Sequence, residues 1–210
     1  MRLRFLGHAA FDLQIEGQRF CLDPHRPGAL GGRFNLPEII GPFDALVVSH
    51  SHEDHAAWTP ALGTTRWIDA DTDMGGLQMR FRAVPHDTEQ GLRMGMSRMM
   101  SMEGEGLRVV HCGDVGCWNE QDLLWLRGCD LLLVPVGGTF TVDGAGAAEL
   151  VELVDPKWVV PMHAADPRVD LELAGIEPFV EALGWPCIEL KHFDSAAPPG
   201  EKTVLRLASP

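Results

Sequence analysis

The stretch VVSHSHEDHAA, residues 47–57, places three of the chain's nine histidines and two acids within six positions. It overlaps the end of the apolar run DALVVS, residues 44–49, whose pattern is typical of a buried strand. Two interpretations are open at this point: a solvated polar loop, or one half of a metal site. Imidazole nitrogens and carboxylate oxygens are ligands that zinc, iron and manganese accept. Histidines and acids elsewhere in the chain therefore decide between the two interpretations.

Composition bounds the classes of protein to consider. The 210 residues are 45% hydrophobic and 22% charged, which predicts one folded domain, residues 1–210, rather than a disordered chain. A net charge of −13 disfavours binding to nucleic acid or to anionic membranes. The five cysteines include no C-x-x-C pair, which fits a reducing compartment.

Targeting and membrane segments are not expected either. The apolar run near the N-terminus is interrupted by Arg4, Gly7 and His8, unlike a signal peptide, and no run of 18 apolar residues could span a membrane. We therefore expect a cytoplasmic protein that acts on a small molecule and binds neither nucleic acid nor membrane. Homo-oligomerisation is left open.

The order of the predicted elements indicates the fold class. Strands are expected over 3–7, 10–15, 18–23, 44–50, 64–70 and 77–85, with a loop rich in proline and glycine over 24–42 and a hairpin over 91–114. Helices over 119–128, 144–155 and 176–184 then alternate with strands over 129–138, 157–163, 187–192 and 202–207. This order predicts an α/β (α+β) fold in which sheet layers are flanked by helices.

A histidine or aspartate comes directly after several of these strands. These residues are Asp23, His50, His86, Asp114 and His163. Because rigid strands hold the residues at their ends along one edge of a sheet, we expect these side chains to meet there. The chemistry suits two metal ions about 3.5–4 Å apart, each bound by part of the set.

The spacing of the histidine cluster carries a resemblance to a known family. The motif H-x-H-x-D-H, formed by His50, His52, Asp54 and His55, resembles that of the metallo-β-lactamase superfamily of hydrolases. The stretches FLGHAAFDLQIEGQRFCLDP and VGGTFTVDGAGAAELVELVDPKWVVPMH are similar to a branch of small bacterial hydrolases that resembles the ascorbate-6-phosphate lactonase. The resemblance implies a four-layer αββα sandwich of two mixed β-sheets flanked by helices, with a metal site at one sheet edge.

The resemblance also implies a ligand set. The first metal would be bound by His50, His52 and His86, and the second by Asp54, His55 and His163, with Asp114 bridging the two. The cofactors would be two divalent ions, Zn2+ in the first place and Mn2+ or Fe2+ as alternatives. Asp54 and Asp114 would also be catalytic, because a carboxylate beside the ions can orient the nucleophile or pass a proton to the leaving group.

Other polar residues keep two interpretations each. Asp23 either orients a ligand histidine or begins a turn, and His8 either lies near the site or has a structural role. His25, Arg26 and Arg33, in the long loop, either bind an anionic group of the substrate or are solvated. His111 and His192 are expected to be structural or exposed. The methionines of residues 94–102 indicate a core strand or, as the alternative, a pocket wall.

These expectations combine into a functional hypothesis. A metal-dependent hydrolase would use an activated hydroxide on a small ester, lactone or phosphodiester. An iron-dependent oxidoreductase on the same fold and a non-enzymatic metal-binding member are the alternatives. Two features depart from related lactonases: the chain has no tyrosine, and AAD comes after His163 where the branch more often has an aromatic residue.

Overall fold

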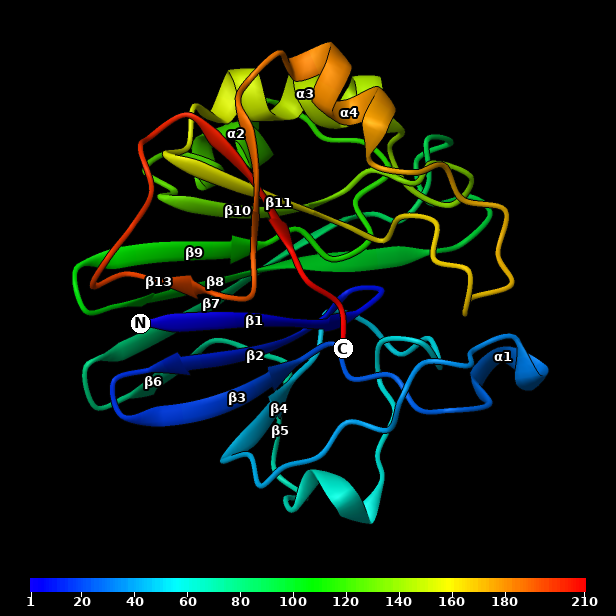
Figure 1. Ribbon diagram of the computed structural model, residues 1–210, viewed down its shortest axis with the longest axis vertical. Coiled ribbons are helices and arrows are strands. Elements are labelled where there is room, and N and C mark those ends of the chain that lie inside the picture. The colour runs from blue at the N-terminus through cyan, green and yellow to red at the C-terminus, as the bar shows by residue number, and fades with distance from the viewer.

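Two β-sheets packed face to face, with helices outside the larger one, form the computed structural model, which describes all 210 residues (Figure 1). The smaller sheet has the strand order β13-β1-β2-β3-β4-β5, and the larger has the order β12-β14-β11-β10-β9-β8-β7-β6. Both sheets are mixed. The predicted fold class, two mixed sheets with helices, is confirmed.

In the smaller sheet the first strands pair in antiparallel and the last strands pair in parallel. Its strands are β1 (Arg2–Gly7), β2 (Ala10–Ile15), β3 (Gln18–Leu22), β4 (Ala45–Val47), β5 (Trp67–Ile68) and β13 (Phe193–Asp194). Strands β3, β4 and β5 pair in parallel, so their carboxyl ends lie at the same edge. That edge is where β3 and β4 lead into Asp23 and His50.

The larger sheet contains the other strands. They are β6 (Thr72–Met74), β7 (Leu77–Pro85), β8 (Met96–Gly104), β9 (Leu107–His111), β10 (Leu131–Pro135), β11 (Trp158–Met162), β12 (Cys187–Leu190) and β14 (Thr203–Leu207). Strands β6 to β9 form an antiparallel meander, whereas β9, β10, β11, β14 and β12 pair in parallel. The sequence did not predict β6 or β13, which are only three and two residues long.

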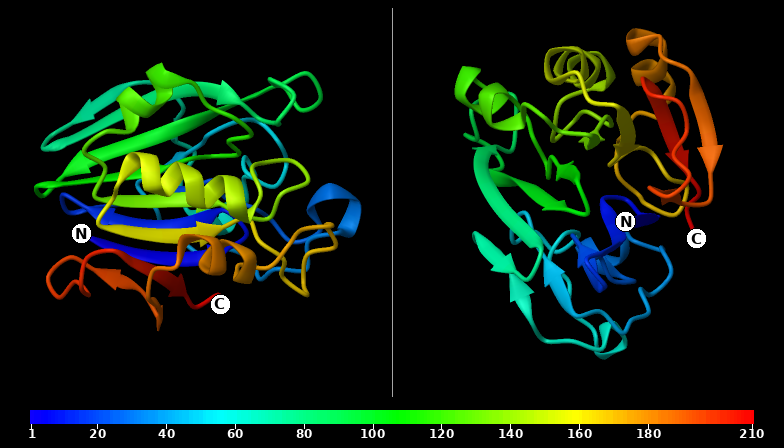
Figure 2. Two further views of the ribbon diagram at one scale, coloured as in Figure 1. Left: turned by 90° about the horizontal axis from the view of Figure 1, so that it is seen from above. Right: turned by 90° about the vertical axis from the view of Figure 1, so that its left-hand side faces the viewer.

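The helices α2 (Glu120–Leu126), α3 (Gly144–Val154) and α4 (Glu177–Leu183) cover the outer face of the larger sheet (Figures 1 and 2). Helix α2 begins at a capping box in which Asn119 and Asp122 each bind the other's backbone N–H. Residues of all three helices pack with strand residues such as Val110 and Val159 in one cluster of 20 buried residues. This layer fixes the strands whose ends form the site.

The outer face of the smaller sheet is covered mainly by irregular chain. The loop from residue 24 to residue 43 and the short turn η1 (Pro60–Leu62) place Ile39, Phe43 and Leu62 against β-strand residues such as Leu46. Within this loop, the four-residue turn α1 (Ala29–Gly32) contains two residues with left-handed backbone angles, Leu30 and Gly31. The chain in this loop is therefore irregular and does not continue as a helix.

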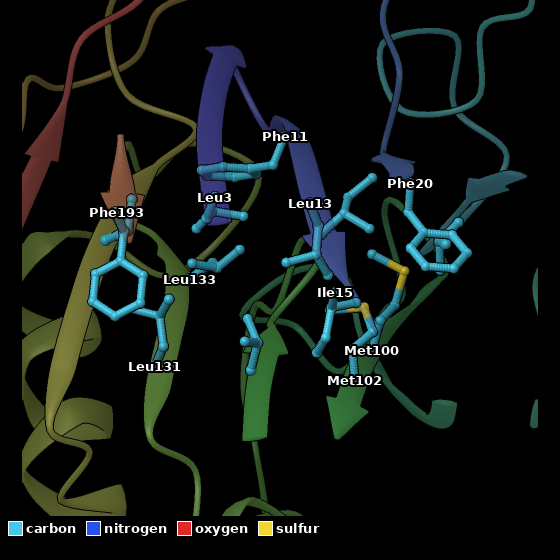
Figure 3. Close-up of a cluster of buried hydrophobic side chains, with 14 of the residues drawn as sticks. Leu3, Phe11, Leu13, Ile15, Phe20, Met100, Met102, Leu131, Leu133 and Phe193 are labelled. Carbon is cyan, nitrogen blue, oxygen red and sulfur yellow. The ribbon is translucent and has the colours of Figure 1, made fainter. Parts of the chain in front are cut away.

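The main core lies between the two sheets (Figure 3). It contains 23 buried residues, and Phe11 and Phe20 of the smaller sheet face Met100 and Leu131 of the larger one. Met99 packs on the other side of the larger sheet, under the helices, so most of the methionine-rich strand is core, as expected. No helix of the structure has the length and apolar character needed to cross a membrane.

Candidate metal centre

One edge of the two sheets gathers most of the chain's histidines. Asp23 comes after β3, the segment 50–55 after β4, His86 after β7 and His163 after β11, and Asp114 lies three residues beyond β9. The histidines and aspartates among them are buried except His52, which is partly exposed. The expected meeting of strand-end side chains is therefore observed, and His8, directly after β1, joins them.

A first group consists of three imidazoles. The His52 Nδ1 atom lies 3.0 Å from His50 Nε2 and 3.1 Å from His86 Nε2. Nδ1 of His86 donates to the carbonyl of Phe140 at 3.0 Å, which orients the ring so that its Nε2 faces the cluster. The other ring nitrogen of His50 lies 2.8 Å from the Ser49 hydroxyl. We call His50, His52 and His86 the three-histidine cluster.

A second group contains a carboxylate. The Asp54 Oδ2 atom lies 3.6 Å from His55 Nε2 and 3.2 Å from His8 Nε2. One potential ligand atom from each of His8, Asp54, His55 and His163 lies within 4.8 Å of the others. We call these four residues the carboxylate cluster. His8 is a member that the sequence placed only near the site.

Asp114 lies between the two clusters. Its Oδ2 atom is 3.2 Å from His86 Nε2 in the three-histidine cluster. The same atom is 3.2 Å from His55 Nε2 and 3.3 Å from His163 Nε2 in the carboxylate cluster. One carboxylate oxygen thus faces ring nitrogens of both groups, which is the geometry that a bridging ligand needs.

Unsatisfied polar atoms show that these residues fit metal ions. Asp114 Oδ1 is buried without a hydrogen-bond partner, and His55 Nε2 forms no hydrogen bond although Asp114 Oδ2 lies 3.2 Å away. A buried polar atom without a partner costs folding free energy, and such atoms call for an explanation such as a bound ion. The donor set of imidazoles and carboxylates, without thiolate, suits zinc, iron or manganese. The clusters can therefore hold metal.

His50 of the first cluster and His55 of the second differ in protonation. Burial lowers the pKa of His50 to about 3, so this ring is neutral at neutral pH. Burial would also lower the pKa of His55, but the carboxylates of Asp114 and Asp54 outweigh it and raise this pKa well above its ordinary value. Burial would raise the pKa of Asp114, yet His163 and His55 hold it well below its usual range. In the metal-free protein, a proton on His55 therefore neutralises part of the negative charge around it.

Asp23 supports the carboxylate cluster from behind. Its carboxylate is fully buried, accepts from the Ser49 amide at 2.7 Å and hydroxyl at 2.6 Å, and lies 2.8 Å from His55 Nδ1. This contact fixes the ring so that His55 Nε2 faces Asp114. The backbone φ angles of His8, Asp23 and His163 are 56°, 41° and 51°, a region that residues other than glycine seldom adopt. Unusual backbone angles of this kind concentrate at functional sites.

The remaining histidines have structural surroundings. His111 is fully buried, and its ring contacts the Ala9 carbonyl at 2.9 Å and the Gly113 amide at 2.9 Å, as expected for a structural residue. His25 Nε2 donates to the Leu6 carbonyl at 3.2 Å. His192 lies 3.3 Å from an Arg2 nitrogen, at the surface.

A cavity of about 400 Å3 opens onto both clusters. Its lining consists of Leu30, Arg33, His52, Glu53, Asp54, His86, Met94, Asp114, Phe140, His163 and Leu171. Of the three loop residues proposed to contact substrate, Arg33 lines this cavity and His25 and Arg26 do not. A larger cavity of about 550 Å3 contains only His8 among the cluster residues.

The apolar part of this lining was not predicted from the sequence, except for Met94. Leu30, Phe140 and Leu171 come from loops, and no periodic pattern marks a loop residue as part of a cavity. Met94 was considered for a pocket wall, and it is the methionine of the 94–102 stretch that lines the cavity.

Comparisons with known proteins agree with this geometry. Residues 2–163 match the Beta-lactamase superfamily domain. A UPF0173 metal-dependent hydrolase of Carboxydothermus hydrogenoformans is 31% identical, in an alignment that covers 98% of this chain and 100% of the relative.

Solved structures show the same fold. A metallo-β-lactamase superfamily protein of Thermotoga maritima has a TM-score of 0.74 and 24% identity, with 98% of each chain covered. CmlA, a diiron β-hydroxylase of Streptomyces venezuelae, has a TM-score of 0.64 and 14% identity, covering 98% of this chain and 52% of its own. At these identities, both are likenesses of fold alone.

Proposed function

The chain belongs to the β-lactamase superfamily domain family and is a metal-dependent hydrolase, and from this premise we propose that it acts through a dinuclear centre. His50, His52 and His86 would hold one ion, and Asp54, His55 and His163 the other. Asp114 would bridge them, because its Oδ2 atom faces ring nitrogens of both clusters. That single observation carries the proposal of two ions rather than one.

We propose Zn2+ as the ion, with Mn2+ or Fe2+ able to occupy the same ligands. When bound, such ions lower the pKa of a water molecule toward 7 and polarise the group under attack. The protein's own carboxylates would supply orientation and proton transfer. Asp54 is held by His8 at 3.2 Å on the cavity wall, where it can orient the nucleophile and carry a proton to the leaving group.

The substrate would be a small ester, lactone or phosphodiester. A cavity of about 400 Å3 accommodates a small molecule, and its mixture of apolar side chains with a few polar groups is usual for such sites. The five cysteines are all unpaired, which supports action in a reducing compartment, the cytoplasm. We propose that residues 1–210 act as one domain.

Metal analysis combined with a substrate screen tests this function. We expect nearly two ions per chain, hydrolysis of at least one class among esters, lactones and phosphodiesters, loss of hydrolysis on chelation and recovery with Zn2+. Hydrolysis that persists in protein freed of metal would contradict the proposal.

An iron-dependent oxidoreductase is the second candidate, favoured by the fold shared with CmlA and by ligands that suit iron. Purified protein that contains iron and consumes oxygen, but hydrolyses nothing when loaded with zinc, would favour this candidate. A non-enzymatic role is disfavoured, because both clusters are complete and open onto a cavity.

A further inference from the structure

We propose that Arg33 is a specificity-determining residue, which binds a carboxylate or phosphate group of the substrate. We further propose that Glu53 positions the loop that carries Arg33. The inference deepens the proposed function and rests on it, because it concerns the substrate of the same cavity. It predicts a substrate with three parts: a hydrolysable bond, a short apolar segment and an anionic group.

The guanidinium of Arg33 has no hydrogen-bond or ion-pair partner within the protein. Arg33 is the only lysine or arginine among the residues that line the cavity, and its side chain is exposed. By contrast, Arg26 and Arg168, in neighbouring loops, are paired with Glu53 and Asp166. A free guanidinium is suited to bind carboxylate or phosphate through two parallel hydrogen bonds.

The backbone of Arg33 is held even though its side chain is free. The Arg33 carbonyl accepts from the Asp170 amide at 2.9 Å. The next residue, Phe34, is fully buried against Ala29 and Val169. A fixed backbone keeps the guanidinium within reach of the cavity, which lowers the entropy lost when a ligand binds.

Glu53 attaches this loop to the metal-binding motif. It lies between His52 and Asp54, at a motif position that has no metal-binding role. One oxygen of its carboxylate accepts from the Leu30 amide at 2.8 Å, and the other pairs with Arg26. The two contacts hold both ends of the segment 26–30 against the site, just before Arg33.

Apart from Arg33, Glu53 and the cluster residues, the cavity lining is apolar. Leu30, Met94, Phe140 and Leu171 are the hydrophobic residues of the lining. An acidic protein with a charge of −13 repels small anions over most of its surface, so a local cation at the cavity is needed for such a substrate to be preferred. The expected ligand therefore places its anion at Arg33 and its apolar segment against these four side chains.

A matched pair of esters tests the assignment. Mono-4-nitrophenyl glutarate and 4-nitrophenyl valerate have the same leaving group and chain length, and differ by a terminal carboxylate in place of a methyl group. With the zinc-loaded protein, we expect a higher kcat/KM for the glutarate. Arg33→Gln should lower the glutarate-to-valerate ratio about tenfold, mainly through KM, because it removes a hydrogen-bonded charge pair. Arg33→Lys should give an intermediate ratio.

Two further variants test the role of Glu53 in positioning the loop and provide a control outside the cavity. Glu53→Ala frees the loop and should lower the same ratio, mainly through a higher KM for the glutarate. Arg127→Gln, at an exposed arginine after α2 and outside the cavity, is the matched control and should leave the ratio unchanged. An equal ratio in wild type and Arg33→Gln would overturn the proposal.

Binding of the corresponding 4-nitroanilides, measured by calorimetry, makes the test independent of ester hydrolysis. Tighter binding of the glutaric compound that is lost in Arg33→Gln supports the anion subsite even where neither ester is hydrolysed, a result that would count against the proposed function alone. Equal binding of both anilides by wild type would overturn the subsite.

Discussion

The three-histidine cluster and the carboxylate cluster lie at the same sheet edge, yet their surroundings differ. The first contains only histidines, and its His52 is partly exposed toward the cavity. The second contains Asp54, is buried, and is supported by Asp23 behind His55. Burial thus lowers the pKa of His50 to about 3, whereas the nearby carboxylates, working against burial, raise the pKa of His55. His50 and His55, two histidines at the same sheet edge, therefore compete differently with protons.

Removing the ligand shared by both clusters should have the largest effect. Asp114→Asn keeps the shape of the side chain but removes the negative charge between two cations, which repel each other strongly at short range. We expect hydrolysis to fall at least about a hundredfold, beyond the 10–100-fold typical of residues that only support a ligand. Kinetics with any substrate found by the screen, together with metal analysis, would measure this.

Folding should be largely unaffected, and a near-native circular dichroism spectrum checks that. Asp69→Asn, at an exposed carboxylate after β5, is the control and should change neither metal content nor rate. If Asp114→Asn retained both ions and full activity, Asp114 would be a turn residue and the two clusters would be independent.

Single-ligand variants should separate the two positions. His50→Ala removes a ring of the three-histidine cluster and His163→Ala one of the carboxylate cluster, so each should lower the metal content from about two toward one. His192→Ala, at a surface histidine paired only with Arg2, should leave the content unchanged. Loss of both ions in either variant would mean that the clusters bind cooperatively, and unchanged content in both would refute the ligand assignment.

Acidification should have a smaller and graded effect that distinguishes the clusters. An ion that binds His55 must displace its proton, because the Asp114 and Asp54 carboxylates, outweighing burial, raise its pKa. Each unit of pH below that pKa should weaken the carboxylate cluster about tenfold. His50 is neutral down to about pH 3, so its protonation does not weaken the three-histidine cluster between pH 8 and pH 6.

A competition titration with a chromophoric chelator at pH 6, 7 and 8 would measure both affinities. The expected result is one steep and one shallow dependence on pH. Two equal slopes would show that the protonation difference between the clusters is not real.

The sequence predicted much of the site because the necessary signals are local. An apolar run that ends in a histidine or aspartate identified the ends of β3, β7 and β11 without any knowledge of contacts, whereas β4 ends at Val47, three residues before the expected end at His50. The helix α2 was expected from Asn119, a residue whose side chain caps the first turn. The ligand roles themselves stay predictions, which the metal analyses of the variants test.

The features that could not be predicted depend on contacts between distant segments. Strands β6 and β13 are too short to show a pattern and exist through pairing with β7 and β1. The role of His8 depends on β1 meeting the histidine motif 46 residues later in the chain. Likewise Phe140 and Leu171 reach the cavity through loop paths that packing determines.

Anomalous X-ray scattering at the zinc absorption edge, on crystals of the zinc-loaded protein, tests the central claim most directly. We expect two peaks about 3.5–4 Å apart, as in other two-metal sites. One should lie among His50, His52 and His86, the other among Asp54, His55 and His163, with the Asp114 carboxylate contacting both. A single peak, or a second peak outside the carboxylate cluster, would contradict the dinuclear centre.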